Sequence, residues 1–324
     1  MKKMGRIMAV ALTVVMAVSM AACGGSSKTK KIGVVQLVEH PALDASYQGF
    51  VDALKEADYI DGENISIDYQ NGQGEQANCQ TIATQFANDK VDMVLAIATP
   101  AAQAAANVIK DIPIMITAIT DPADAKLVDS NEKPGGNVTG TSDLTPVKEQ
   151  MELLKQLVPD VKSVAVMYTS SEPNSVFQAN LAHAAAEEMG IETFEATISS
   201  TNELQQVVES VIGKADAIYI PTDNAFANAM ATVTLITRPE GIPVIVGESG
   251  MVDNGGLATV GIDYYKLGYQ TGEMAVRILN GEEEPADMPI EYLNEYDFSI
   301  NTETAEELGI EIPAELAEKN TFGK

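Results

Sequence analysis

The 324-residue chain contains no tryptophan, two cysteines, two histidines and three arginines. Only Arg238 among the arginines lies near a loop that could face a ligand, so we expect no two-pronged guanidinium clamp on a carboxylate or phosphate. The chain also lacks HExxH, paired CxxC, G-x-S-x-G and phosphate-loop patterns. The sequence therefore predicts no metal site, no cofactor and no catalytic centre.

Positive charge is scarce as well. Lysine and arginine total 20 against 47 aspartates and glutamates, which gives a formal net charge of −27. Such a chain repels phosphate backbones and anionic lipid headgroups, so nucleic acid is excluded as a partner. We interpret the acidity mainly as a solvated surface, because net charge affects solubility and encounter rather than fold.

The long apolar run is confined to the N-terminus. Residues 1–22 carry Lys2, Lys3 and Arg6 before an apolar stretch, and small residues precede Cys23, which is typical of an export signal. The segment resembles a bacterial lipoprotein signal with lipidation at Cys23 and a tether over 23–30, although Met20 replaces the usual leucine. A plain secretory signal is the alternative. Cys79, the other cysteine, falls in a helical pattern and is predicted to be a buried core residue.

An internal duplication organises the rest of the chain. The segment 135–143, GGNVTGTSD, returns without a gap as 255–263, GGLATVGID, and the strands upstream recur in the same order. The spacing is too long for a solenoid repeat, since solenoid periods run at roughly 20–50 residues. Two lobes of one fold explain it better, and the length agrees with two domains.

Each half alternates short β-branched runs with helical periodicity. This alternation predicts an α/β fold with two doubly wound parallel-sheet lobes. Strands are predicted at 31–37, 64–69, 92–97, 113–117, 137–141, 162–168, 191–197, 216–220, 243–247 and 257–261. Helices are predicted at roughly 45–57, 75–89, 100–109, 146–158, 174–189, 201–213, 224–236 and 264–280.

The repeat ends, Asp143 and Asp263, are each followed by a long helix, so the chain is expected to cross between lobes there. A third crossing is predicted near 285–289. The predicted first lobe is therefore 31–142 plus 264–286, and the second is 143–263 plus 287–324. Several linkers at one edge make a hinge rather than a loose tether.

Ligands of such sheets bind beyond the carboxyl ends of the strands, against helix N-termini. Helix caps mark these points in the sequence at Thr99-Pro100, Asp121-Pro122 and Asp223-Asn224, and polar loops follow the strands at 39–44 and 168–175. Ordinary capping is the alternative for each. His40 lies in one of these loops and could reach a ligand, whereas His183 is predicted to lie on a helix surface.

The runs VDMVLAIATPAAQAA, IPIMITAITDPADAKLV, GGNVTGTSD and IYIPTDNA resemble the ABC-transporter substrate-binding lipoproteins grouped with tryptophan/tyrosine uptake. This resemblance implies a type I periplasmic-binding-protein fold and a lipid-anchored extracytoplasmic protein. Such a protein would carry a small ligand to an ABC permease and its ATPase. The matching ligand positions are Thr99, Pro100, Thr117, Asp121, Asn174, Ser175, Asp223, Asn224 and Glu248.

Acidic residues at these loops suit an ammonium group or hydroxyl donors. They are Asp44, Asp121, Asp223 and Glu248. An aromatic or large apolar amino acid is the first choice, with Tyr47, Tyr168 and Phe226 as walls or, alternatively, core residues. The absence of tryptophan places a sugar second. A ligand-sensing receptor subunit shares all these features, whereas a hydrolase would need a nucleophile–base pair that His40 alone cannot supply.

Overall fold

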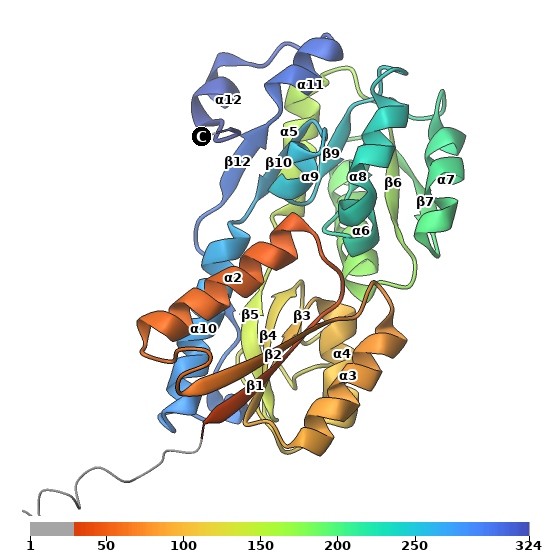
Figure 1. Ribbon diagram of the computed structural model, residues 1–324. Coiled ribbons are helices and arrows are strands. Elements are labelled where there is room, and N and C mark those ends of the chain that lie inside the picture. Colours follow the sequence, from red (N-terminus) through yellow and green to blue (C-terminus); the bar gives the residue numbers. More distant parts are fainter. Residues whose placement is uncertain (1–28, 324) are drawn as a thin grey trace, which may run out of the picture.

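Two six-stranded sheets organise residues 29–323, the part of the chain that the computed structural model describes. The predicted signal peptide and Cys23 lie outside these residues. Lys30, which the predicted tether includes, already belongs to the first strand. Figure 1 shows the two sheets in separate lobes, one above the other.

The first lobe contains a sheet with the order β11-β5-β4-β3-β1-β2, and every neighbouring pair in it is parallel. Its strands are β1 (Lys30–Gln36), β2 (Ile65–Asn71), β3 (Met93–Ile97), β4 (Ile114–Ile119), β5 (Val138–Ser142) and β11 (Glu291–Tyr292). Its helices are α2 (Pro41–Glu56), α3 (Gln76–Asp89), α4 (Thr99–Val108) and α10 (Tyr264–Leu279), with the short turn η2 (Pro285–Asp287). Cys79 is buried in its core, as predicted.

The second lobe repeats this order as β12-β10-β9-β8-β6-β7 and is parallel except for the antiparallel pair β10–β12. Its strands are β6 (Ser163–Thr169), β7 (Glu192–Ile198), β8 (Ala217–Ile220), β9 (Val244–Val246), β10 (Ala258–Gly261) and β12 (Asp297–Ile300). Its helices are α5 (Val147–Leu157), α6 (Pro173–Glu188), η1 (Thr201–Glu203), α7 (Leu204–Val211), α8 (Asn224–Thr237), α9 (Ser249–Asp253), α11 (Thr302–Glu307) and α12 (Ala314–Lys319). The predicted α/β two-lobe fold class is confirmed.

Three local predictions need correction. The helix expected from residue 45 begins at Pro41, because proline suits the first helical position. No helix follows Asp121, whose side chain instead accepts hydrogen bonds from the amides of Ala123 and Asp124 in a turn. The helix expected over 201–213 divides into η1 and the shorter α7.

The chain passes between the lobes after β5, after β10 and after β11. The first two passages include Asp143 and Asp263, where the repeat predicted them. The third differs from the prediction at 285–289, because β11 pairs in parallel with β5 of the first sheet. Residues 287–292 therefore belong to the first lobe, and the chain returns to the second lobe between Tyr292 and Asp297.

Helices α2 and α10 of the first lobe pack with their backbones in near contact. A Cβ atom built on Gly268 would lie 1.9 Å from the carbonyl oxygen of Ser46, and one on Gly49 would lie 2.0 Å from that of Tyr265. No side chain larger than hydrogen fits at either place. The glycines therefore allow the two helices to lie closer than alanine would permit.

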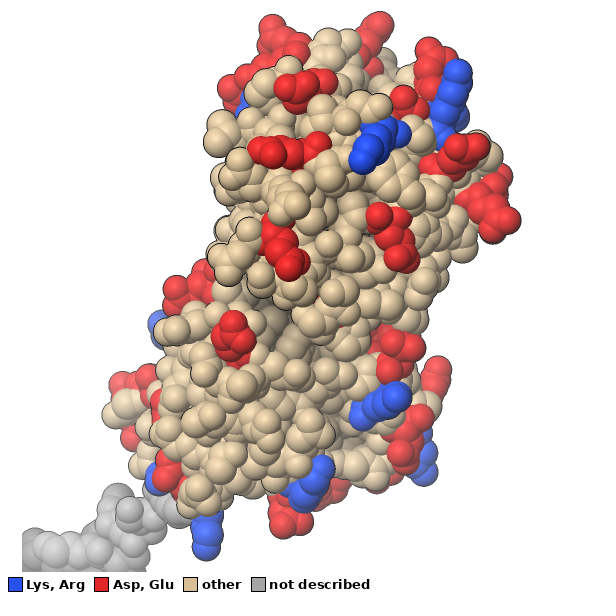
Figure 2. All heavy atoms as spheres, turned by 90° about the vertical axis from the view of Figure 1, so that its right-hand side faces the viewer, with Lys and Arg blue, Asp and Glu red and all other residues tan. Residues whose placement is uncertain are grey.

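Within residues 29–323 no helix is both long and apolar enough to cross a membrane. Charged side chains are spread over both lobes on the face shown in Figure 2 and form no single acidic patch there. This distribution fits the interpretation of the net charge as a solvated surface.

Candidate functional site

The two lobes enclose a narrow cavity of about 20 Å³, which we call the inner cavity. It lies at the carboxyl ends of the strands, where the duplicated fold predicts the ligand. Its lining residues come from both lobes: His40, Leu43, Ala118, Asp143, Tyr264, Asn174, Thr222, Asp223, Asn224, Ala227, Glu248 and Met251. No lysine or arginine is among them.

A wider space of about 400 Å³, the outer cleft, also lies between the lobes. The first lobe contributes Leu37, Val38, Pro100 and residues 73–77 to its lining, and the second contributes Thr169, Ser171, Glu172, residues 199–201, Asn224, Ala225 and Asn228. Asn224, the first residue of α8, lines both spaces. Together they have the size of a small-molecule site.

Two side-chain contacts join the lobes beside these spaces. His40, immediately before α2, places Nε2 3.3 Å from Oδ1 of Asn224, the first residue of α8. Gln178 of α6 donates to the hydroxyl of Thr120, which follows β4, at 3.1 Å. Both pairs are buried, and the lobes are therefore in contact around the site.

Two carboxylates occupy the N-terminus of α8. Asp223 caps the helix by accepting from the amide of Phe226 at 3.0 Å, and it also accepts from the amide and hydroxyl of Thr169 at 2.6 and 2.9 Å. Glu172 accepts from the amides of Asn224 and Ala225, both at 3.2 Å. These backbone N–H groups are the ones that a helix start leaves unpaired.

Burial and the neighbouring charge of Asp223 raise the pKa of Glu172 to about 8. Burial also raises the pKa of Asp223, against the lowering effect of its hydrogen bonds. When two neighbouring carboxyl groups are both out of water, their mutual repulsion favours the protonated form of one of them. The site thus has more buried acid groups than the protein itself can neutralise.

Two further acids line the inner cavity from other directions. Asp143 accepts from the hydroxyl of Tyr264 at 2.8 Å, and Glu248 accepts from the amide of Gly250 at 2.6 Å as the cap of α9. Burial raises the pKa of Asp143 to about 6 and that of Glu248 to about 7. No positively charged side chain of the described residues compensates for them in the cavity.

Backbone strain accompanies the site in the first lobe. Ala118, which lines the inner cavity, has a φ of 57°, and Ala98, which precedes α4, has a φ of 80°. Alanine rarely adopts this left-handed region, and such strain persists where the surroundings fix it. At Ala118 the register between β4 and β5 also shifts, so β4 extends irregularly to Ile119 instead of ending at 117.

The predicted ligand residues fall into three groups. Asn174, Asp223, Asn224 and Glu248 line the inner cavity, and Pro100 lines the outer cleft. Thr99, Thr117 and Ser175 are buried but line neither space. Asp44 is exposed and accepts from Gln36, and Asp121 is used in its turn, so neither acid is brought to the inner cavity or the outer cleft.

The aromatic residues proposed as walls do not line either space. Tyr168 and Phe226 are buried in the cores of the second lobe, and Tyr47 packs against Tyr69 with ring centroids 4.7 Å apart. The alternative interpretation as core residues fits Tyr168 and Phe226. The sequence prediction missed Glu172 and Tyr264, although Glu172 belongs to the polar loop 168–175.

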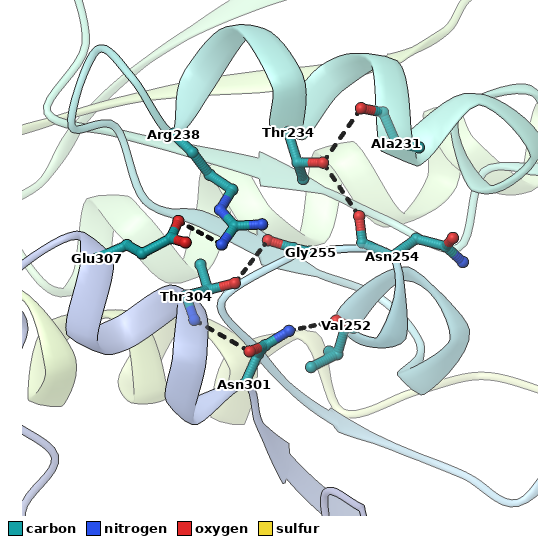
Figure 3. A network of polar contacts seen from close by, with 9 residues as sticks. All are labelled: Ala231, Thr234, Arg238, Val252, Asn254, Gly255, Asn301, Thr304 and Glu307. Carbon is teal, nitrogen blue, oxygen red and sulfur yellow. Dashed lines mark hydrogen bonds and ion pairs between the residues drawn. The ribbon is translucent and has the colours of Figure 1, made fainter.

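Arg238 is used elsewhere in the second lobe. Figure 3 shows it at the end of α8, where its guanidinium pairs with Glu307 of α11. Neither residue lines the inner cavity or the outer cleft. Arg238, the one arginine expected near a ligand loop, is thus held away from both spaces.

Two α/β lobes, three crossings and a buried cavity between the lobes are the architecture of the type I periplasmic-binding-protein fold. The chain belongs to the ABC transporter substrate binding protein family, whose model matches residues 31–321. Its members are extracytoplasmic partners of ABC transporters for small molecules.

The chain is similar to several characterised proteins. It is 46% identical to a tyrosine-binding protein of Clostridioides difficile, over 88% of this chain and 83% of that one. It is 41% identical to an ABC domain from Streptococcus pneumoniae solved in complex with L-Trp, with a TM-score of 0.88 over 91% of this chain and 99% of that one. It is 49% identical to CD0873 of Clostridium difficile, a substrate binding protein solved in a ligand-free, open structure, with a TM-score of 0.69 over 90% and 98%.

The two solved structures rank in opposite orders by TM-score and by sequence identity. The open structure is the more similar in sequence, yet it superposes less well than the L-Trp complex. The relation of the two lobes in this chain is thus closer to that in the complex. The buried contacts between the lobes agree with a closed arrangement.

Proposed function

We propose that this protein is a lipid-anchored, non-enzymatic binding protein that captures an aromatic amino acid between its lobes and delivers it to an ABC permease and its ATPase. The observation that carries the choice of ligand class is the inner cavity, in which buried acids meet no lysine or arginine. A ligand that brings its own positive charge would neutralise them, and an amino acid does so through its ammonium group.

The relatives support the same class, because one is named a tyrosine-binding protein and another was solved with L-Trp. A sugar offers hydroxyls but no cation, so it would leave the buried carboxylates uncompensated. A sensing role would use the same site. We therefore favour amino-acid uptake, with anchoring through Cys23 and closure about the hinge at Asp143 and Asp263 as parts of the proposal.

Thermal unfolding of the mature protein with single ligands tests the proposal. Tyrosine, tryptophan or phenylalanine should raise the melting temperature, since a ligand at 100 times its Kd adds about 2.7 kcal/mol of stability. Acidic amino acids and sugars serve as matched negative ligands. A sugar that stabilises the protein while no aromatic amino acid does so would overturn the choice of ligand.

A further inference from the structure

We propose that the inner cavity holds the primary ammonium group of the ligand against three acceptor atoms: Asp143 Oδ1, Asn174 Oδ1 and His40 Nδ1. This inference rests on the proposed function and adds the atoms that recognise the ligand. All three atoms are buried and have no hydrogen-bond partner, and all three residues line the inner cavity. A buried polar atom without a partner costs free energy, so each needs a donor.

The amide of Asn174 can be oriented from its neighbours. Its Nδ2 lies 3.0 Å from the carbonyl oxygen of Thr222, which can only accept, and 3.3 Å from a carboxylate oxygen of Glu172. The nitrogen must therefore be on that side. Oδ1 is left as an acceptor without a donor.

The tautomer of His40 follows from the same reasoning. Asn224 donates through Nδ2 to Glu172 at 2.6 Å, so its Oδ1 faces Nε2 of His40 as an acceptor. Nε2 must carry the proton. Burial lowers the pKa of His40, which favours the neutral ring. In a neutral ring with a protonated Nε2, Nδ1 is an acceptor.

Asp143 supplies the charge. Its Oδ2 accepts from the hydroxyl of Tyr264, and its Oδ1 has no hydrogen-bond partner. The nearby hydroxyl of Thr120 lowers the pKa of this carboxyl and so favours its charged form. A carboxylate with a free oxygen in a dry cavity is stabilised most by a cation. Among the lining residues none is a lysine or arginine, so the cation must come with the ligand.

Three acceptors match the three N–H donors of a primary ammonium. A hydroxyl has one donor, which is too few for three acceptors. A planar guanidinium has five donors, which is too many, and it is too large for a cavity of about 20 Å³. His40 belongs to the first lobe, Asn174 to the second, and Asp143 to the first crossing between them. An ammonium bound to all three therefore binds the closed form better than the open one and shifts the population toward it.

Pairs of ligands that differ only in the amino group test the inference. We would measure the affinity of the wild-type protein for L-tyrosine and 3-(4-hydroxyphenyl)propionate, and for L-tryptophan and indole-3-propionate, by calorimetry. Each amino acid should bind at least about 30-fold more tightly than its deaminated analogue, because loss of the ammonium group leaves a desolvated carboxylate of the protein unpaired. Asp143→Asn should reduce this ratio, since it weakens binding of the amino acid and not of the deaminated analogue.

Asp263→Asn is the matched control. Asp263 occupies the equivalent place in the repeat and caps α10 through the amide of Lys266, but it does not line the inner cavity. It should keep the wild-type ratio. Equal affinities of the wild type for an amino acid and its deaminated analogue would overturn the inference and leave the proposed function standing. Failure of the wild type to bind any aromatic amino acid would instead remove the proposed function.

Equal wild-type affinities for an amino acid and its deaminated analogue would overturn the inference even if Asp143→Asn does not fold. If the variant folds and keeps the full ratio, Asp143 is not the recognising charge and the inference is wrong. A ratio that falls equally in the Asp263→Asn control would also contradict it, because the effect would then be general rather than local.

Discussion

Replacement of Asp223 by asparagine separates a structural role from a ligand-binding role. As a plain helix cap the change should cost little, since asparagine caps as well as aspartate. The structure predicts a larger loss, because both oxygens of Asp223 are used. Oδ1 accepts from Phe226 and from the Thr169 hydroxyl, and Oδ2 accepts from the amide of Thr169. An amide has one oxygen and cannot serve both sides.

The magnitude follows from the donor that loses its partner. If the asparagine oxygen stays on Phe226, the NH₂ group faces the Thr169 amide, and that buried donor is left unsatisfied. The cost is about 1–3 kcal/mol of unfolding free energy. If the amide flips, the helix loses its cap, at about 0.5–2 kcal/mol. At roughly 2–4 °C per kcal/mol, the melting temperature should fall by roughly 2–12 °C in the first case and roughly 1–8 °C in the second.

Thermal unfolding and calorimetric titration of the same variant provide the assay. Asp263→Asn is the control, because Asp263 accepts from one backbone amide and its partner Lys266 forms only an exposed ion pair. We expect Asp223→Asn to melt lower than this control and to keep an affinity close to the wild-type value. Wild-type melting combined with a tenfold or greater loss of affinity would refute this reasoning and restore Asp223 as the ammonium partner.

Four further predictions concern other parts of the chain. Gly268→Ala should cost about 1–3 kcal/mol of stability by overpacking α2 against α10, whereas Gly136→Ala, with nothing within 4 Å of its Cβ, should melt as wild type. Without ligand, the unfolding free energy should fall between about pH 4.5 and pH 7. The pKa of Glu248 is about 7 in the folded state, so over this range the folded state binds more protons than the unfolded state and loses stability as the pH rises. Glu248→Gln should flatten that part of a profile of melting temperature against pH. Cys23→Ala should move the protein from the membrane to the soluble fraction, and unchanged fractionation would contradict lipid anchoring. Small-angle scattering should give a smaller radius of gyration with a bound aromatic amino acid than without, and identical curves at saturation would contradict hinge closure.

The sequence predicted the order of strands and helices because each apolar run is local and the repeat shows it twice. It also predicted Asp223 and Asn224 between the lobes, since residues after parallel strands meet at one sheet edge. Asn174 and Glu248 were expected there because they match the ligand positions that the family resemblance implies. Asp44 failed because α2 begins earlier than its periodicity indicated, which places this acid on the exposed side of the first turn.

Other parts of the site depend on contacts that no local pattern contains. Glu172 is held at the site by hydrogen bonds from the backbone amides at the start of α8, about fifty residues further along the chain. Ala118 lines the inner cavity through an unusual backbone conformation, and an alanine in a strand gives no sign of it. The two-residue strand β11 is too short for periodicity to reveal, which is why the third crossing was placed too early.

The glycine contacts between α2 and α10 have a mechanical consequence. Helix α10 starts directly after the second crossing, and α2 starts directly after His40. Because Gly49 and Gly268 bring the two backbones into near contact with no side chains between them, α2 and α10 should move together as one rigid body. A rotation of the lobes at the second crossing would then move His40 together with α10. The hydrogen bond between His40 and Asn224 would therefore form when the lobes close and break when they open.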